Sequence, residues 1–315
     1  MGHPTVSVIL PVRNGARFLP EALESISAQT LREIEILLID DGSTDSSPEI
    51  AREFARRDGR FIVLSQEHRG IASALNTGIR MARGRYVARM DADDVAVPLR
   101  IERQVAFLAA NPRCVALGSD VEIIDEEGQA LGTVAHSRRH ADIERLLLSA
   151  CHNSLVHPSV VMRTDAVRSI GGYRAETYPS EDFDLWLRLS EIGELANLGE
   201  TLLRYRRHRD AVCVRERQRQ IVMTSGLVDA ARSRRGLSPL PRRMRSANAS
   251  SAAATYHFDC ARVALKSGKR LAAMRHAGAS ILSDPLWMKP YAAIAACALP
   301  TRLVTGLYSR LSAIF

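Results

Sequence analysis

The sequence has no apolar run long enough to cross a lipid bilayer as a helix, which takes about 20 residues. The run Val6–Val12 has only seven residues and contains Ser7 and Pro11, and the run Tyr291–Leu299 is closed by Pro300. Residues 1–5 also lack the basic segment and apolar core that begin a secretory signal peptide. We therefore expect a chain that has no membrane span and begins folding in the cytoplasm.

Paired cysteines are also absent. The five cysteines stand at 114, 151, 213, 260 and 297, and no two of them form a CxxC motif. An odd number of widely spaced cysteines is not typical of a disulfide framework and favours a reducing compartment. Cys151 with His152 and His157 has the residue types of a metal site, but no second ligand pair follows, so we favour ordinary packing roles for them.

Aromatic residues make up only 5% of the chain, and its 35 acidic residues are outnumbered by 43 Lys and Arg. The formal net charge of +8 would suit nucleic acid, an anionic membrane or a phosphorylated substrate. Much of this charge is local, because residues 204–245 hold 13 arginines and only three acids. This stretch has few aromatics and no recognisable nucleic-acid-binding motif, so we expect no nucleic acid partner.

The first half of the sequence alternates short apolar runs with amphipathic stretches. The predicted strands are Val6–Leu10, Ile34–Ile39, Phe61–Leu64 and Tyr86–Met90, and the predicted helices are Leu19–Gln29, 47–57 and Gly70–Ala82. This alternation is typical of an α/β fold with a mostly parallel central sheet flanked by helices. Further strands are predicted at Val115–Leu117, Val121–Ile124, Ser159–Met162 and Leu202–Tyr205, a helix over Phe183–Ile192, and helices throughout 216–315. We therefore expect an α/β domain over residues 1–215 and a basic, Ala- and Leu-rich helical extension over 216–315.

Polar clusters follow three of the predicted strands, at residues 11–15, 40–45 and 91–94. Ligands of open α/β sheets bind beyond the carboxyl ends of the strands. In the third cluster, Asp91, Asp93 and Asp94 would repel one another unless a cation neutralised them, and carboxylates are preferred ligands of hard divalent ions. In isolation such a motif is more often a solvated acidic loop, but its position after a strand favours the cation. The segment 40–45 has the composition of an ordinary Asp-Gly-Ser turn. The alternative is that one of its carboxylates faces the cleft and accepts a hydrogen bond from a base N–H or a ribose hydroxyl.

Glu181 and Asp182 begin the helix predicted around Phe183–Ile192. An acid at a helix N-terminus often serves only to balance the helix dipole. The alternative is a general base in a cleft, with the nearby Trp186 ring forming the floor under a sugar.

These pieces together resemble a known family. The matching segments are 4–14 (PTVSVILPVRN), 21–30 (EALESISAQT), 40–46 (DDGSTDS), 70–92 (GIASALNTGIRMARGRYVARMDA), 157–163 (HPSVVMR), 171–173 and 181–189 (EDFDLWLRL). In kind and order they are similar to the motifs of family-two inverting glycosyltransferases, which have the Rossmann-like GT-A fold. The resemblance covers about residues 4–208, and it is specific for the family but not for a sugar.

The resemblance implies how a nucleotide-sugar donor would be bound. Pro11, Arg13 and Asn14 match the loop that lies against the base, and Asp41 matches the aspartate that hydrogen-bonds a uracil or thymine ring. The family usually has tyrosine where Arg13 stands, and that ring stacks on the pyrimidine. A guanidinium also stacks on a base, so this departure bears on the nucleotide and not on the fold.

The resemblance also implies a divalent cation, Mg²⁺ or Mn²⁺. Asp91 and Asp93 match the family's DxD motif, in which Asp93 would be the metal ligand and Asp91 would lie on the ribose or diphosphate side. His208 matches a late histidine that approaches the metal or the diphosphate in several members. The alternative for His208 is one more polar residue in a basic stretch.

Asp182 matches the catalytic base of the family, and Glu181 and Trp186 would shape the acceptor site. The implied enzyme is a metal-dependent hexosyl- or deoxyhexosyltransferase. It would move a sugar from a UDP- or dTDP-linked donor, with inversion, to a hydroxyl of a glycan or lipid-linked acceptor in cell-surface polysaccharide biosynthesis. Two alternatives stay open: a nucleotidyltransferase acting on sugar phosphates, although residues 12–17 lack the spacing of its phosphate loop, and an inactive membrane-associated adaptor, which the intact motifs disfavour.

The last third of the sequence bears on location. The arginines of 204–245 could approach anionic headgroups, and Trp287, Tyr291, Leu299 and Phe315 lie in apolar stretches suited to a membrane interface. Family members often modify lipid-linked glycans, so the resemblance implies a peripheral position at the inner face of the cell membrane. The alternative is that these residues pack a helical subdomain and that the arginines form a solvated face.

Overall fold

The computed structural model describes residues 3–150, 153–240 and 251–298. Within this part the chain forms two compact units, and neither is one continuous stretch of sequence. The first comprises 1–121, 135–205 and 219–241, and the second comprises 122–134, 206–218 and 242–315. The chain therefore passes between the units several times. The end of the α/β domain near residue 215 stays a prediction.

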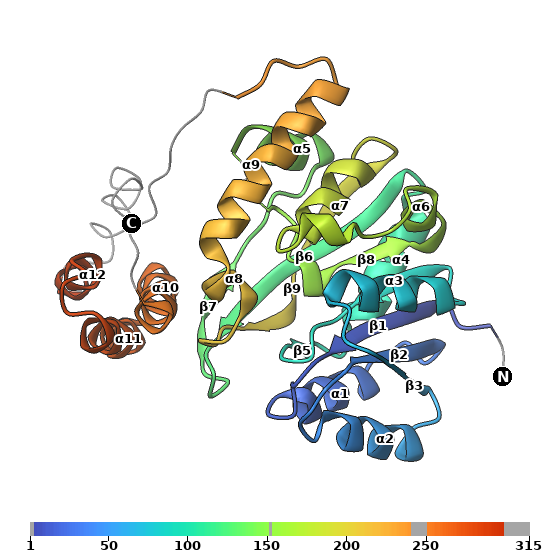
Figure 1. Ribbon diagram of the computed structural model, residues 1–315, viewed down its shortest axis with the longest axis horizontal. Helices are drawn as coiled ribbons and strands as arrows, with labels where there is room; N and C mark the ends of the chain where they lie inside the picture. Colours follow the sequence, from blue (N-terminus) through green and yellow to red (C-terminus); the bar gives the residue numbers. More distant parts are fainter. Residues whose placement is uncertain (1–2, 151–152, 241–250, 299–315) are drawn as a thin grey trace. The chain divides into compact units, whose positions relative to one another are not determined.

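The first unit is built on a parallel group of four strands (Figure 1). The strands are β1 (Val6–Val12), β2 (Ile34–Asp41), β3 (Phe61–Gln66) and β4 (Tyr86–Arg89), in the order β3-β2-β1-β4. Each begins at the residue where a strand was predicted; β1, β2 and β3 run two residues further than predicted, and β4 ends one residue earlier. Pro11, predicted in a turn, lies within β1 opposite Ile39. Because Val12 stands opposite Asp40, the loops that follow β1 and β2 leave the same edge of the sheet together.

The sheet continues beyond β4 with antiparallel pairs. β8 (Val161–Arg163) pairs with β4 and with β6 (Cys114–Ile124), and β5 (Val95–Ala96) pairs with β9 (Glu194–Arg206). The full order is β3-β2-β1-β4-β8-β6-β9-β5, with β7 (Ala130–Val134) on β6. Two separate strands predicted within 115–124 are one strand, β6. This mixed sheet gives the predicted α/β architecture.

Helices surround this sheet. In the first unit they are α1 (Leu19–Ser27), α2 (Ser47–Arg57), α3 (Ile71–Met81), α4 (Arg100–Ala110), α5 (His140–Ala150), α6 (Thr164–Ser169), α7 (Glu181–Leu189) and most of α9 (Arg217–Arg234). The core joins sheet residues such as Ile9 and Leu37 to Leu75 of α3, Trp186 of α7 and Val228 of α9. Apolar side chains on almost every turn of α7 are buried in this core, so its first turn is held at a fixed place beside the sheet.

The second unit contains α8 (Val212–Arg215), α10 (Ala252–Lys266), α11 (Arg270–Ser283) and α12 (Lys289–Cys297), as well as the tip of the β6–β7 hairpin. Small side chains allow the last three helices to approach closely around a core of Phe258, Ala261, Ala277 and Ala293, with Trp287 packed against it. At the hairpin, the fully buried Asp125 is paired with Arg275. Helices were predicted here, and none of those described has both the length and the apolar character of a bilayer-crossing segment.

Candidate active site

The loops after β1 and β2 are tied together by hydrogen bonds. The Asn14 N–H donates to Ser43 Oγ at 3.0 Å, and the Thr44 N–H donates to Asn14 Oδ1 at 2.8 Å. The Ala16 N–H donates to Asp45 Oδ2 at 3.0 Å. Asn14 adopts a positive φ of 52°, a conformation that asparagine tolerates better than most residues. The two segments predicted to bind the donor therefore form one continuous surface at the sheet edge.

Pro11 and Arg13 lie on either side of the strand end. Pro11 is buried within β1, whereas Arg13 is exposed just beyond it. Pro11 can therefore support the loop from beneath, and Arg13 is the member of the pair whose side chain is accessible to a nucleotide. Stacking of Arg13 on a base stays a prediction.

Asp41 ends β2 as a buried carboxylate with four donors. Oδ1 accepts from Gln66 Nε2 at 2.7 Å and from the Arg69 N–H at 3.0 Å, while Oδ2 contacts His68 Nδ1 at 2.7 Å and accepts from the Gly70 N–H at 2.9 Å. Burial alone raises the pKa of Asp41, but these hydrogen bonds outweigh it and the net pKa is lowered. Each oxygen already accepts two bonds, so a base N–H would have to displace a donor. His68 has 46% of its side chain exposed, so a nucleotide can approach this donor from solvent.

The acidic cluster after β4 is compact. Asp91, Asp93 and Asp94 each offer a carboxylate oxygen, and these oxygens lie within 4.8 Å of one another. Asp91 and Asp93 are partly exposed and Asp94 is fully buried. Converging carboxylate oxygens are the donor set that Mg²⁺ or Mn²⁺ prefers, so these residues fit the predicted cation. An open side toward solvent would leave coordination positions for diphosphate oxygens.

Two buried arginines lie next to the acidic cluster. Arg89, the last residue of β4, is 2% exposed and is ion-paired with Asp91. Arg100, at the start of α4, is fully buried and donates through Nη2 to the Arg89 carbonyl oxygen at 2.7 Å. Burial lowers the pKa of Arg100 to about 9, although the charge of Asp94 opposes this. Arg100 thus fixes the backbone from which the acidic loop begins. Neither arginine was predicted as a site residue.

The first turn of α7 carries the second pair of acids. Glu181 is 7% exposed, and Asp182 is partly buried and accepts a 2.6 Å hydrogen bond from Asn153 Nδ2. Burial raises the pKa of Glu181, and the neighbouring Asp182 charge raises it further. Burial also raises the pKa of Asp182, more than the hydrogen bonds to its carboxylate lower it. A carboxylate whose pKa is raised is a better proton acceptor, as a general base requires.

The Arg89 guanidinium interacts with the acids that follow β4 and with those of α7. The charge of Arg89 lowers the pKa of both Glu181 and Asp182, and the charge of Asp91 raises that of Glu181. The carboxylates of the acidic cluster and of the Glu-Asp pair are therefore close enough to interact. Arg89, at the end of the strand between them, supplies the opposite charge that lets them lie together in a buried site.

His157 and Tyr173 complete this buried centre. Their side chains are joined by a 2.7 Å hydrogen bond between His157 Nε2 and the Tyr173 hydroxyl. Burial lowers the pKa of His157 well below its usual value, and the charge of Arg89 adds to this, so the imidazole is neutral at pH 7. The backbone of Tyr173 is held by Asn76 of α3 through bonds of 2.8 and 2.9 Å. A Cβ on Gly172, where φ is 69°, would lie 2.4 Å from Asn76 Oδ1, so this close approach requires glycine.

Three sequence predictions need comment against these positions. Trp186 has no exposed surface, and its ring lies edge-on to His157 in the core. A fully buried ring cannot lie under an acceptor sugar, so we reassign Trp186 to packing behind the site. His208 belongs to the second unit, and its approach to the metal stays a prediction. Cys151 and His152 lie outside the described residues. His157 has a packing role, because its ring is hydrogen-bonded to the Tyr173 hydroxyl.

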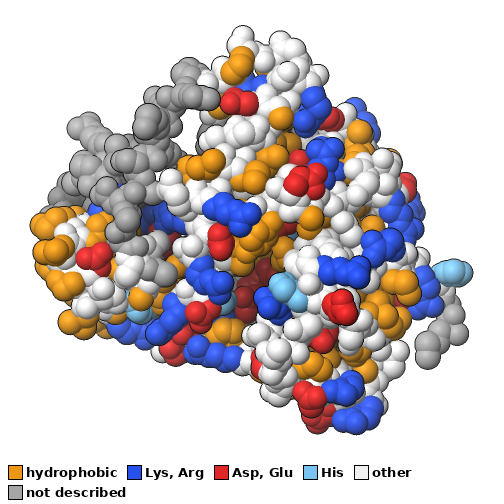
Figure 2. Space-filling model, viewed as in Figure 1, with side chains coloured by type: hydrophobic (Ala, Val, Ile, Leu, Met, Phe, Trp, Pro, Cys, Tyr) orange, Lys and Arg blue, Asp and Glu red, His pale blue; other side chains and the backbone are white. Residues whose placement is uncertain are grey.

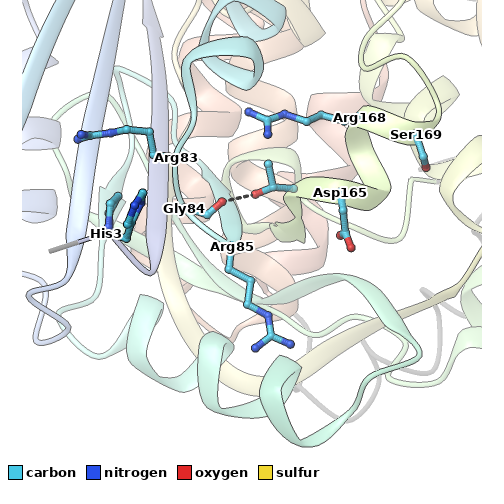
Figure 3. Close-up of a pocket in the computed structure, with 9 residues that line it drawn as sticks. His3, Arg83, Gly84, Arg85, Asp165, Arg168 and Ser169 are labelled. Atoms are coloured by element: carbon cyan, nitrogen blue, oxygen red, sulfur yellow. Dashed lines mark hydrogen bonds between the residues drawn. The ribbon is translucent and has the colours of Figure 1, made fainter.

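A separate hollow lies at the opposite ends of the parallel strands (Figure 3). It is lined by residues that precede β1 and β4 and by residues of α6, including His3, Arg83, Arg85 and Arg168. The Arg85 guanidinium points away from those of Arg83 and Arg168. Arg83 is paired with Glu35, and Arg168 donates to carbonyl oxygens at the end of α3. These arginines already have structural partners, and the acids predicted to bind the donor lie at the other edge of the sheet.

The match to known proteins agrees with the geometry at the carboxyl edge. The model of the family described as glycosyl transferase family 2 matches residues 7–167, just over half of the 315 residues. The chain belongs to this family. Its membership makes the protein a glycosyltransferase and removes the nucleotidyltransferase and adaptor alternatives.

Individual relatives extend the match beyond that segment. Over 213 residues the chain is 35% identical to the putative glycosyltransferase EpsE of Bacillus subtilis. This similarity covers 66% of this chain and 75% of EpsE. Over 197 residues it is 35% identical to the amylovoran biosynthesis glycosyltransferase AmsE of Erwinia amylovora, spanning 62% and 72%. The mannosyltransferase PcManGT from Pyrobaculum calidifontis, solved in complex with GDP-Man and Mn²⁺, has a TM-score of 0.57 at 18% identity and covers 100% of this chain and 86% of its own. This similarity confirms the predicted GT-A fold.

Proposed function

We propose that this glycosyltransferase transfers a hexosyl or deoxyhexosyl group, with inversion, from a nucleotide-sugar to a hydroxyl of a glycan or lipid-linked acceptor in cell-surface polysaccharide biosynthesis. The observation that carries the proposal is the meeting of two acidic groups, Asp91–Asp94 and Glu181-Asp182, around the buried Arg89. One group suits a cation and a diphosphate, and the other suits proton removal. The name of AmsE supports a role in polysaccharide biosynthesis.

Donor binding is assigned to the linked loops after β1 and β2. Arg13 would stack on the base, Asn14 and Pro11 would hold the loop that carries it, and Asp41 would accept a hydrogen bond from the base once His68 is displaced. The family resemblance, in which this aspartate binds a uracil or thymine ring, favours UDP- or dTDP-sugars. The GDP-Man bound to PcManGT makes a guanine nucleotide the donor class to compare.

The acidic cluster would hold Mg²⁺ or Mn²⁺ through Asp93, with Asp91 turned toward the ribose or diphosphate. A bound divalent ion supplies positive charge that stabilises the leaving diphosphate. The Mn²⁺ in the PcManGT complex supports this choice of ion. Arg89 pairs with Asp91 and so keeps that carboxylate oriented. His208 is proposed as a further ligand on this side.

Asp182 is assigned as the general base. An acceptor hydroxyl that attacks the anomeric carbon from the face opposite the diphosphate must lose its proton, and a single carboxylate suffices for this displacement. Asp182 as a residue is partly exposed, unlike the buried Glu181 beside it, and Asn153 fixes the orientation of its carboxylate. Glu181 is more deeply buried beside it and would border the acceptor site.

Release of free nucleoside diphosphate from a panel of UDP-, dTDP- and GDP-sugars, with Mn²⁺ or with a chelator, tests this function. We expect Mn²⁺-dependent release from at least one donor. The variant Asp182→Asn keeps the shape and removes the basicity, so kcat should fall by about 10² to 10⁴ with donor affinity nearly unchanged. Asp165→Asn, an exposed carboxylate in α6, is the matched control. Collapse of donor affinity in Asp182→Asn would instead make Asp182 a binding residue.

A further inference from the structure

The last two described helices expose large apolar side chains. Leu271 is 81% exposed, Leu282 85%, Leu286 91% and Met288 71%. Single exposed apolar residues are common on protein surfaces, but several close together mark an interaction site. Three of these four lie within seven consecutive residues, 282–288, at the turn between α11 and α12.

Exposed apolar side chains follow one another along α11, the turn and α12, and this set of residues is called the strip below. At 100° per residue, Leu271, Met274 and Leu282 share one face of α11. The strip continues through the turn with Leu286 and Met288, and α12 adds Tyr291 and Ile294, which are 40% and 38% exposed and one helical turn apart. Figure 2 shows hydrophobic side chains gathered at the left of the view, over this unit.

The strip is flanked by positive charge. Residues 262–298 contain six Lys and Arg and a single acid, Asp284. Lys269, Arg270 and Arg275 line one hollow together with Leu271 at the start of α11. Leu271 therefore lies beside basic side chains. Arg275 is ion-paired with Asp125, and Lys269 donates to the Ala130 carbonyl oxygen. The attraction to an anionic surface therefore rests on the excess of five basic residues over residues 262–298, which suits a partner with an apolar interior and an anionic surface.

This charge distribution selects among occupants. A second copy of the chain would bring the same cations face to face, which like-charge repulsion disfavours. An anionic bilayer instead offers acyl chains to the leucines and phosphates to the lysines and arginines. The residues differ from those expected from sequence. Trp287 packs on Phe258 with ring centroids 4.9 Å apart, and Leu299 and Phe315 lie outside the described residues.

We propose that α11, α12 and the turn between them form a docking surface for an anionic lipid bilayer, with Leu282, Leu286 and Met288 entering the interface and the basic residues contacting headgroups. This places the enzyme at the surface where a lipid-linked acceptor would lie. The docking surface itself does not depend on the identity of the donor or on the assignment of Asp182.

Flotation of the full chain with vesicles tests the proposal. Vesicles of 30% phosphatidylglycerol in phosphatidylcholine are compared with pure phosphatidylcholine, at low and high salt. We expect binding to the anionic vesicles that weakens at high salt, because salt screens the headgroup contacts. Leu286→Glu and Leu282→Glu should each lower the partition coefficient about tenfold, the order expected for losing one buried leucine. Met81 of α3 is 51% exposed and lies about 200 residues before the docking surface in the sequence. Met81→Glu adds the same charge there and should bind the vesicles as the unaltered protein does.

Failure of the unaltered protein to float with anionic vesicles would contradict the proposal, and so would equal flotation of all three variants. A dimer in solution that Leu286→Glu converts to monomer would also contradict it, because a second copy of the chain would then be the occupant of this surface. All four proteins should melt at the same temperature, since the changes are at exposed sites. Nucleoside diphosphate release in solution is measured in parallel. Its loss from every protein would count against the proposed function, whereas altered flotation with intact release bears on docking alone.

Discussion

Replacing Asn153 with alanine should raise the pKa that controls catalysis without removing any catalytic group. Asn153 donates to Asp182 Oδ2 at 2.6 Å and thereby favours the ionised form of the proposed base. A hydrogen bond to a charged group contributes about 1.5–3 kcal/mol. Asp182 is only partly buried, so water would recover part of this. A net loss of about 1 kcal/mol corresponds to a rise of about 0.7 in pKa, at 1.36 kcal/mol per unit.

The sign of the pH effect follows from the form that acts. The base must be ionised, so a higher pKa moves the acid limb of kcat/KM toward higher pH. Below this limb the variant should be about fivefold slower, as a shift of about 0.7 implies, and well above it the two proteins should converge. The assay is nucleoside diphosphate release from the preferred donor between pH 5 and 9. Asn111→Ala, which removes an exposed bond at the end of α4, is the matched control.

Two outcomes would refute this reasoning. An unchanged acid limb with a lower plateau would mean that Asn153 positions substrate and does not tune a base. An unchanged profile at every pH would mean that Asp182 is not the group whose ionisation limits the reaction. Thermal melting of the variant separates either result from a loss of folded protein.

Two further changes probe the donor side of the site. Asp93→Ala should abolish Mn²⁺-dependent release and Mn²⁺ binding by calorimetry, while the melting temperature measured without metal stays near that of the unaltered protein; full activity at ordinary Mn²⁺ levels would remove the cation from this residue. Asp41→Asn places an amide NH₂ against the N–H groups that now donate to the carboxylate. The Kd for the nucleotide-sugar should therefore rise at least tenfold, and the free energy of unfolding should fall by about 2 kcal/mol. A loss of stability with unchanged affinity for the nucleotide-sugar would mean that Asp41 only holds the loop.

The regular elements near the N-terminus were predictable because local signals agree with the tertiary structure. Ser47 followed by Pro48 predicts a helix start, and α2 begins there. The strand over 114–124 was predicted in two pieces because Ser119 and Asp120 interrupt its apolar pattern. Both are buried, and Asp120 is satisfied by Arg138 at 2.7 Å. The local pattern implied that Asp120 would be exposed to solvent, but a hydrogen bond from Arg138 allows it to be buried.

The buried centre of the site could be predicted only in part. The motifs brought out Asp91, Asp93 and Asp182, whose chemistry is visible in their residue types. Arg89 was missed, although a charge inside the predicted strand Tyr86–Met90 was a usable signal, because such a residue needs a buried partner. Asn153, 29 positions from Asp182, gave no local signal. The burial of Trp186 also had a signal, since it lies one helical turn from the apolar Phe183 and Leu189.

The hydrogen bonds between the loops after β1 and β2 have a consequence for engineering donor preference. Asn14 exchanges bonds with both Ser43 and Thr44, and the next residues are fastened to Asp45 and Ser47. If residues 13–16 alone were replaced by those of a relative, the new loop would lie against residues 43–47 of this protein, whose hydrogen bonds fit the original loop. Nucleotide specificity should therefore transfer between family members only when residues 13–16 and 42–47 are exchanged as one cassette, and single-loop chimaeras should lose affinity for both donors.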